Sequence, residues 1–392
     1  ADKKAHAKSG MWWENEGQRA LANNSVSYKS KPEMGTFMRE WVSLYESKSG
    51  ERGIFNRQAA DIQVGRNGRR EQGHMWGTNP CSEIILRPYQ FCNLSEIVVR
   101  ESDDLASLKR KVRLATILGT LQSTMTDFKY LRNVWKKNTE EERLLGVSLT
   151  GIMDHPVLSK NVDSKRWLEE MKEEAVKVNK EYAKKLGIPQ SAAITCVKPS
   201  GTVSQLVDAA SGIHARHHPH YIRTVRGDNK DPLTQFLIDS GVPAERDVMK
   251  PESTTVFSFP MESPKGAVTR TEMTAIQQLE LWKTYALHWC EHKPSITVSV
   301  KEEEWMEVGS WVYENFDVAS GVSFLPFSDH TYQQAPYQDI EPDDYLEWKQ
   351  RMSHVEIDWS RLTEFEKEDN TTGSRELACT AGVCEVVDLN AA

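Results

Sequence analysis

A short stretch of this sequence combines four side chains that are suited to chemistry: Asn79, Cys81, Glu83 and Cys92. They lie in TNPCSEIILRPYQFCNLSE, residues 78–96, whose prolines disfavour a helix. We therefore predict an extended chain, in which alternate side chains share a face. One face would then carry an amide, a thiol and a carboxylate, which is an unusual set of groups to bury without a purpose.

A second candidate site is the turn KPSGTVS, residues 198–204, which follows an apolar strand and begins a predicted helix. The first N–H groups of a helix are unpaired and carry the positive end of its dipole, and Gly201 would let an anion approach the backbone. Ser200, Thr202 and Ser204 add hydroxyl donors. The turn suits phosphate, although plain capping of the helix by Ser or Thr explains the same residues.

Three further groups of residues contain side chains that could form a site. Cys379 and Cys384, in the small-residue segment ACTAGVC, allow half of a zinc site or a flexible dithiol that exchanges with another disulfide. The histidines of HARHHPH, residues 214–220, lack the helical spacing of metal ligands, so a loop or a contact near phosphate is favoured over a metal site. Cys196 and Cys290 lie in apolar segments and are expected to be buried.

The elements that must position these residues alternate between strands and helices, which indicates an α/β fold. Helices are predicted at 32–48, 104–140, 163–187, 271–292 and 341–352. Strands or apolar segments are predicted near the end of 1–30, at 143–156, at the start of 192–207, at 294–300 and at 321–327. We interpret 49–73 as a loop rich in Gly and Arg, and the residues from Glu366 onward as a polar tail.

Composition limits the class of protein. The 392 residues carry a net charge of −8, which disfavours nucleic acid as a partner because phosphate binding needs an excess of Lys and Arg. No apolar run reaches the roughly 20 residues of a membrane span, and the first residues lack the apolar core of a signal peptide. Six cysteines in this length are ordinary usage. We expect a cytoplasmic protein whose thiols are reduced.

Together the motifs resemble the catalytic chain of ribonucleotide reductases. Asn-Pro-Cys-x-Glu at 79–83 and Cys-Asn-Leu-Ser-Glu at 92–96 are similar to the active-site finger loop of that family. Pro-Ser-Gly-Thr at 199–202 is similar to its substrate-phosphate turn, and the terminal Cys-x4-Cys to its shuttle dithiol. Gly-Ile-His at 212–214 and the segment YIRTVR follow the same pattern. Several motifs in the right order make the resemblance specific.

The resemblance implies a role for each residue of the finger loop. Cys81 would carry a thiyl radical that takes the 3′-hydrogen of the substrate. Glu83 would accept the 3′-OH proton as a general base, and Asn79 would orient the ribose hydroxyls. The 2′-OH then leaves as water.

The resemblance also implies a path for electrons and a place for the phosphates. Cys92 would be half of a redox pair. Cys379 and Cys384 would reduce this pair again, and thioredoxin would reduce them in turn. The residues expected to hold the substrate phosphates are Pro199, Ser200, Gly201, Thr202 and Val203.

The residues of these motifs are most similar to those of class II enzymes, which depend on adenosylcobalamin. Within class II they are most similar to the branch that reduces triphosphates. Class I enzymes carry a stacked tyrosine pair on the last barrel strand, which relays a radical from a partner subunit. Phe324 and Leu325 stand where we would align those tyrosines, and neither can be oxidised as a phenol can. We therefore expect adenosylcobalamin as the cofactor and no metal site made of side chains.

The resemblance implies a ten-stranded α/β barrel with Cys81 on an internal loop. Residues 1–365 would form the later portion of the barrel, and residues 366–392 a flexible redox tail. No cysteine precedes Cys81, so we expect the partner of Cys92 and the N-terminal half of the barrel on a separate chain or an upstream segment. The alternatives are a class I-like catalytic subunit with a metal-cofactor partner, a nucleotide-binding fragment without turnover, and, more distantly, a structural zinc module.

Overall fold

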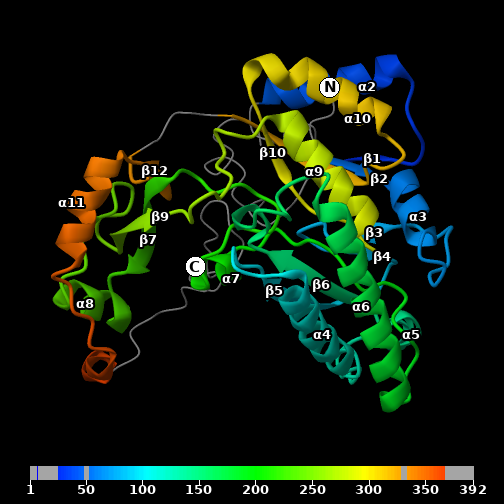
Figure 1. Ribbon diagram of the computed structural model, residues 1–392, viewed down its shortest axis with the longest axis horizontal. Coiled ribbons are helices and arrows are strands. Elements are labelled where there is room, and N and C mark those ends of the chain that lie inside the picture. Colours follow the sequence, from blue (N-terminus) through cyan, green and yellow to red (C-terminus); the bar gives the residue numbers. More distant parts are fainter. Residues whose placement is uncertain (1–6, 8–24, 48–52, 328–332, 367–392) are drawn as a thin grey trace, which may run out of the picture. The chain divides into compact units, whose positions relative to one another are not determined.

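The computed structural model describes residue 7 and residues 25–47, 53–327 and 333–366 (Figure 1). They fall into two compact units. The larger unit comprises the described parts of Ala1–Ala215, Gly266–Val268 and Glu272–Phe327. The smaller unit comprises the described parts of Arg216–Lys265, Thr269–Thr271 and Ser328–Ala392. The sequence interpretation did not anticipate the smaller unit.

The larger unit alternates strands and helices, as the sequence predicted. Its strands are β1 (Ser25–Tyr28), β2 (Gly53–Asn56), β3 (Gly77–Thr78), β4 (Ile85–Leu86), β5 (Asn93–Val98), β6 (Leu145–Thr150), β10 (Thr297–Val300) and β11 (Gly321–Pro326). Its helices are α2 (Met34–Ser47), α3 (Arg57–Gly65), α4 (Leu105–Gln122), α5 (Asn133–Glu142), α6 (Ser164–Leu186), α7 (Thr202–Leu206), α9 (Ala275–His288) and α10 (Trp305–Glu314). Short 3-10 turns lie at Ile152–Asp154 and Glu302–Glu304.

A mostly parallel sheet organises the larger unit. β5 pairs with β6, and β10 pairs with β11, both in parallel. Residues 193–197 join these pairs, because they bridge β6 at Thr195 and the chain ahead of β10 at Val197. β2 then pairs with β11 in the antiparallel sense, and β1 lies beyond β2. The described strands thus run in the order β5, β6, 193–197, β10, β11, β2, β1.

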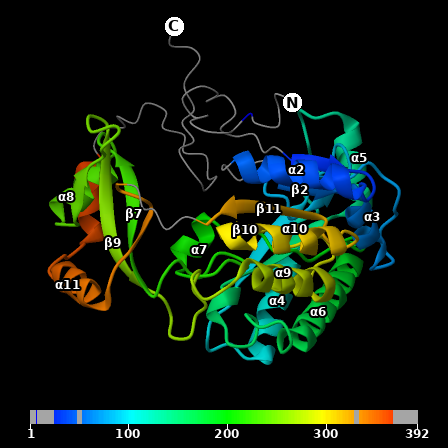
Figure 2. The ribbon, with the colours of Figure 1, turned by 90° about the horizontal axis from the view of Figure 1, so that it is seen from above.

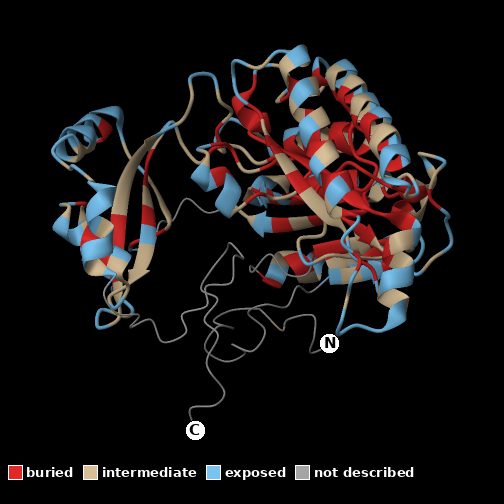
Figure 3. Cartoon of the chain, turned by 90° about the horizontal axis from the view of Figure 1, so that it is seen from below, coloured by how far each residue is buried: buried red, intermediate tan, exposed pale blue. Residues whose placement is uncertain are grey.

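Helices connect the parallel strands and cover one face of the sheet. Parallel neighbours need long crossover connections, and α4, α6, α9 and α10 lie in these connections (Figure 2). α4 packs against α6 and β5, and α6 packs against α9. Buried residues concentrate in the central strands, whereas the outer sides of the helices are exposed (Figure 3). All six residues of β6 are buried, as expected for a parallel strand inside such a fold.

The smaller unit is built on an antiparallel sheet in the order β12, β7, β9, β8. Its strands are β7 (His220–Asp228), β8 (Ala244–Arg246), β9 (Thr254–Glu262) and β12 (Tyr337–Asp339), and its helices are α8 (Pro232–Asp239), α11 (Pro342–Met352) and α12 (Leu362–Phe365). A 3-10 turn, Trp359–Arg361, precedes α12. His217 of the His-rich segment pairs with Asp339 at 2.6 Å and stacks on Tyr337. Among the described residues, no group of three or more His, Cys, Asp or Glu side chains could hold a metal ion.

Long periodic elements were predicted well and short ones poorly. Helices at 32–48, 163–187 and 341–352 are confirmed by α2, α6 and α11. The loop predicted at 49–73 is wrong, because β2 and α3 lie within it, and the Asn56 side chain caps α3 by accepting from Ala59 N. The helix predicted at 104–140 is interrupted between α4 and α5. No helix in the described ranges is both long and apolar enough to cross a membrane.

Candidate active site

The connection between β3 and β4 places Cys81 and Glu83 on a tight turn. Ser82 N donates to Asn79 O at 2.9 Å, and Ser82 adopts a φ of 67°. The extended conformation predicted for this stretch is therefore wrong at residues 79–83, since a turn satisfies the prolines as well as a strand would. Asn79 does not lie beside Cys81 by alternation; its Oδ1 accepts from Ile84 N at 3.0 Å.

Lys293 and Ser295, which lie just before β10 in the sequence, hold this turn in place. Lys293 Nζ donates to the carbonyl and, at 3.1 Å, to the hydroxyl of Ser82. Ser295 Oγ donates to Cys81 O at 2.6 Å. Burial lowers the pKa of Lys293 to about 8, although the charge of Glu83 opposes this shift. These bonds fix a left-handed backbone at Ser82, which a residue other than glycine adopts only when its surroundings demand it.

Glu83 is a buried carboxylate that lies between the thiols and a lysine. Its side chain is 0% exposed, and neither of its oxygens accepts a hydrogen bond from the described residues. Lys198 Nζ forms an ion pair with Glu83 Oε1 at 3.6 Å. Burial alone would lower the pKa of Lys198, but Glu83 and the Cys81 thiol raise it above its ordinary value. Cys81, Glu83 and Lys198 therefore form one electrostatic group.

Cys92 lies close to the same group, just before β5. It packs against Leu144, Ala192 and Ala193. Burial raises the pKa of the Cys92 thiol to about 12, and the charge of Glu83 acts in the same direction. Cys92 is therefore a neutral thiol at physiological pH and keeps its proton.

The turn packs on the face of the sheet that the helices leave free. At Gly146 of β6, an added Cβ would lie 2.5 Å from Leu94 Cδ2 and 2.8 Å from Ile84 Cδ1. It would also lie 3.3 Å from Cys196 Sγ. Glycine at this position thus lets the loop that carries Cys81 approach the sheet. Cys196 is fully buried and Cys290 is 3% exposed, which confirms the burial predicted for both.

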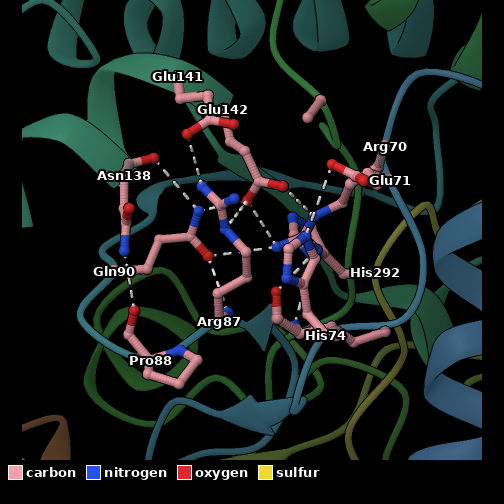
Figure 4. A network of polar contacts seen from close by, with 12 residues as sticks. Arg70, Glu71, His74, Arg87, Pro88, Gln90, Asn138, Glu141, Glu142 and His292 are labelled. Atoms are coloured by element: carbon pink, nitrogen blue, oxygen red, sulfur yellow. Dashed lines mark hydrogen bonds and ion pairs between the residues drawn. The ribbon is translucent and has the colours of Figure 1, made fainter. Parts of the chain in front are cut away.

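A buried charged network fixes the part of the loop that lies between the two thiols (Figure 4). The Arg70 guanidinium binds both oxygens of Glu142, at 3.0 and 2.9 Å, and donates to Ile85 O at 2.8 Å. The Gln90 side chain accepts from Arg87 N at 2.9 Å and donates to Glu142. We refer to Arg70 and Glu142, with the bonds they make, as the clamp.

His292 links the same part of the loop to β6. Its Nδ1 accepts from Ile85 N at 3.3 Å, and its Nε2 lies 2.9 Å from Leu145 O. Burial, together with the charge of Arg70, lowers the pKa of His292 to about 3. The imidazole is therefore neutral, with Nε2 as the donor to the carbonyl.

The phosphate turn lies next to this group in the chain. Ser200 Oγ donates to Glu96 Oε2 at 3.1 Å, and Ser204 N donates to Ser200 Oγ. Burial raises the pKa of Glu96, against the lowering effect of the hydrogen bond from Ser200. The helix predicted after the turn is confirmed as α7, but it has only five residues, so its dipole is small.

The structure brings together most of the residues predicted from the sequence. Cys81, Glu83 and Cys92 surround one lysine, and the phosphate turn begins at the residue after it. Cys379 and Cys384 lie outside the described residues. Sequence reasoning missed four residues that shape the site: Arg70, Glu142, Lys198 and Lys293. Lys198 could have been found from its position directly before Pro-Ser-Gly-Thr, whereas the others have no local signal.

Strand β11 confirms the strand predicted around Phe324 and Leu325. Phe324 is buried and packs edge-on against Trp41 at 5.0 Å between ring centroids. Leu325 is on the opposite face and is exposed. Neither residue offers a phenol to the site.

Known proteins resemble this chain in sequence. It is 27% identical over 347 residues to the adenosylcobalamin-dependent ribonucleoside-triphosphate reductase of Lactobacillus delbrueckii subsp. bulgaricus, covering 80% of this chain and 46% of that protein. It is 28% identical over 299 residues to the enzyme of the same name from Euglena gracilis, covering 75% and 40%. No family model matches the sequence. The chain thus spans about half the length, or less, of these two relatives.

Solved structures resemble it in fold. A B12-dependent class II ribonucleotide reductase superposes with a TM-score of 0.74 at 22% identity, over 94% of this chain and 55% of that one. The alpha subunit of the class Id enzyme from Actinobacillus ureae gives 0.52 at 14% identity, over 74% and 61%. Sequence and fold together confirm the resemblance of this chain to the catalytic chain of class II, adenosylcobalamin-dependent ribonucleotide reductases.

Proposed function

We propose that this chain carries the catalytic thiol of a ribonucleotide reductase, whose complete form converts ribonucleotides to 2′-deoxyribonucleotides. The observation that carries the proposal is the Glu83 carboxylate, which is wholly buried beside Cys81 and accepts no hydrogen bond from the described residues. Burying a carboxylate whose oxygens accept no hydrogen bond is costly, even with an ion pair beside it. A substrate hydroxyl placed over the two side chains would satisfy it.

The reaction follows from the residues around this hydroxyl. Cys81, as a thiyl radical, takes the hydrogen atom from C3′ and leaves a carbon radical there. Glu83 accepts the 3′-OH proton as general base, and the C2′–O bond breaks to release water. The Asn79 side chain, whose Oδ1 accepts from Ile84 N, would orient the ribose through its Nδ2. The turn at Pro199–Val203 would hold the phosphates.

Two electrons and two protons come from a pair of thiols, which becomes a disulfide while one C–OH becomes C–H. Cys92 is proposed as one of them, and its neutral thiol suits a group that must supply a proton. Cys81 then returns its hydrogen atom to C3′ and regains the radical. Cys379 and Cys384 would reduce the disulfide, and thioredoxin would reduce them, in the cytoplasm.

Adenosylcobalamin, when bound, would supply the radical that Cys81 carries. Strand β11 fits this source, because Phe324 is committed to the core and Leu325 has no oxidisable group. The alternative, a class I-like subunit with a metal-cofactor partner, would need a different radical path. The proposal therefore favours class II.

We also propose that an upstream segment, on this polypeptide or on another, completes a ten-stranded barrel. β5 and β1 stand at the two ends of the described sheet, and a closed barrel has no such edges. The relatives are about twice as long as the matched part. This segment would also supply the thiol that pairs with Cys92.

The test uses the complete enzyme, with the upstream segment restored and adenosylcobalamin and thioredoxin present. Cys81→Ser should abolish both deoxynucleotide formation and exchange of the substrate 3′-hydrogen while nucleotide binding survives. Cys290→Ser, which alters a buried thiol away from the turn, should retain turnover. Product from the Cys81 variant would overturn the proposed role of Cys81. A wild-type protein that binds nucleotide without turnover would favour the nucleotide-binding fragment.

A further inference from the structure

Lys198 has a backbone position that is unusually well fixed. It follows residues 193–197, where the chain leaves the sheet, and its N–H donates to Ser148 Oγ of β6 at 2.8 Å. On its other side, Gly212 has a φ of 52°, and a Cβ there would lie 2.4 Å from Lys198 O. The chain is therefore packed against Lys198 so closely that only glycine fits. The side chain starts from a rigid point.

The ammonium group of Lys198 is the counter-ion of Glu83. Charged side chains that interact with Glu83 in the described part of the chain include Lys198, Lys293 and Glu96. Lys293 Nζ is engaged with Ser82, and Glu96 is acidic. A buried carboxylate without hydrogen bonds is stabilised by an opposite charge. Lys198, 3.6 Å from Glu83 Oε1, provides it.

Lys198 also connects the thiol to the phosphate turn. The Cys81 thiol and the Glu96 carboxylate both interact with its charge. Glu96 in turn accepts from Ser200 at 3.1 Å, within the turn that begins one residue after Lys198. Lys198 is therefore linked to that turn by the chain and, through Glu96, by charge.

We infer that Lys198 is a positioning residue, which acts as the counter-ion of the Glu83 carboxylate beside Cys81 and links both groups to the turn at Pro199–Val203. The inference rests on the proposed function for its catalytic consequence. Its effect on Cys81 and Glu83 needs no substrate. A general base that must accept the 3′-OH proton works only as the anion, so loss of Lys198 should slow chemistry more than it weakens binding.

The test compares Lys198→Met with Lys198→Arg in the complete enzyme. Lys111→Met is a matched control, because Lys111 is 33% exposed and pairs with the buried Asp103, much as Lys198 is 29% exposed and pairs with Glu83. The first readout is the rate of Cys81 alkylation by iodoacetamide at fixed pH, followed by mass spectrometry. The thiolate is the reacting species, and a nearby ammonium group favours it. The second is the pH profile of kcat.

Lys198→Met should slow alkylation of Cys81 by about tenfold or more and move the acidic limb of the kcat profile up by about one pH unit. KM should change less than kcat. Lys198→Arg should recover most of both effects, and Lys111→Met should cause neither. If Cys81 in Lys198→Met is alkylated at the wild-type rate and the pH profile of kcat is unchanged, the inference is overturned. A wild-type enzyme that reduces no nucleotide would refute the proposed function. The alkylation rates would still test the inference about Lys198, because alkylation needs no turnover.

Discussion

The clamp should determine how well the segment between Cys81 and Cys92 stays closed. Arg70 has a side chain with 0% exposure, and its substitution by Met removes the paired bonds to Glu142 and the bond to Ile85 O. Removal of Arg70 leaves the buried Glu142 carboxylate with Arg87 Nε, 3.6 Å away, as its remaining counter-ion, and removal of one partner from a buried ion pair typically costs about 3–5 kcal/mol. At about 1.4 kcal/mol per factor of ten, local opening should become about 100-fold to 4,000-fold more frequent.

Alkylation of Cys92 reports this opening, because in the closed state the thiol packs partly buried against Leu144, Ala192 and Ala193 and burial raises its pKa to about 12. The assay follows modification of each cysteine by mass spectrometry under native conditions. Arg113→Met is the control, since Arg113 makes ion pairs at the surface of α4 and should leave Cys92 protected. If Cys92 stays equally protected in Arg70→Met, the clamp does not hold the loop and the reasoning fails.

Two further predictions concern packing and pH. Gly146→Ala should lower the free energy of unfolding by about 1–3 kcal/mol and speed Cys92 alkylation, because its Cβ would overlap Leu94 and Ile84; Gly119→Ala, whose Cβ meets only ordinary contacts at 3.5 Å, should be neutral or stabilising in thermal unfolding. The pKa of His292 is lowered to about 3, so the unfolded chain binds a proton that the folded chain does not between about pH 6.5 and pH 3. The free energy of unfolding should therefore decrease as the pH is lowered through that window, by up to about 1.4 kcal/mol per pH unit. His292→Gln should remove that part of the pH dependence in urea titrations. An identical pH dependence in the variant would contradict a buried neutral imidazole.

The sequence predicted what local patterns determine. α6 was predicted almost to the residue, because its 23 residues carry an apolar stripe long enough to be unambiguous. α3 was missed because its flanks are rich in Gly and Arg, and its burial depends on partners such as Ala286 O and Cys290 O, which bind Gln63. The smaller unit was missed because its antiparallel strands are separated by long connections.

For the site too, the sequence predicted the residues but not their arrangement. Cys81, Glu83 and Cys92 were identified from their spacing, but their geometry was not. The turn at Ser82 is held by Lys293 and Ser295, which are more than 200 residues away in the sequence. Such contacts leave no periodic signal near either partner.

The contrast between the clamp and the Glu83 carboxylate suggests how the loop between Cys81 and Cys92 serves the proposed reaction. The base of the loop is held by charges that are fully paired, in the clamp, while the tip holds a carboxylate that is left without hydrogen bonds. A fully satisfied network is rigid, and an unsatisfied group is ready to bind. The rigid base would therefore fix the distance from Cys81 to Cys92, and the tip would gain its missing hydrogen bond only when a hydroxyl arrives. A radical formed on a thiol in such a site would meet the substrate with its general base already in place.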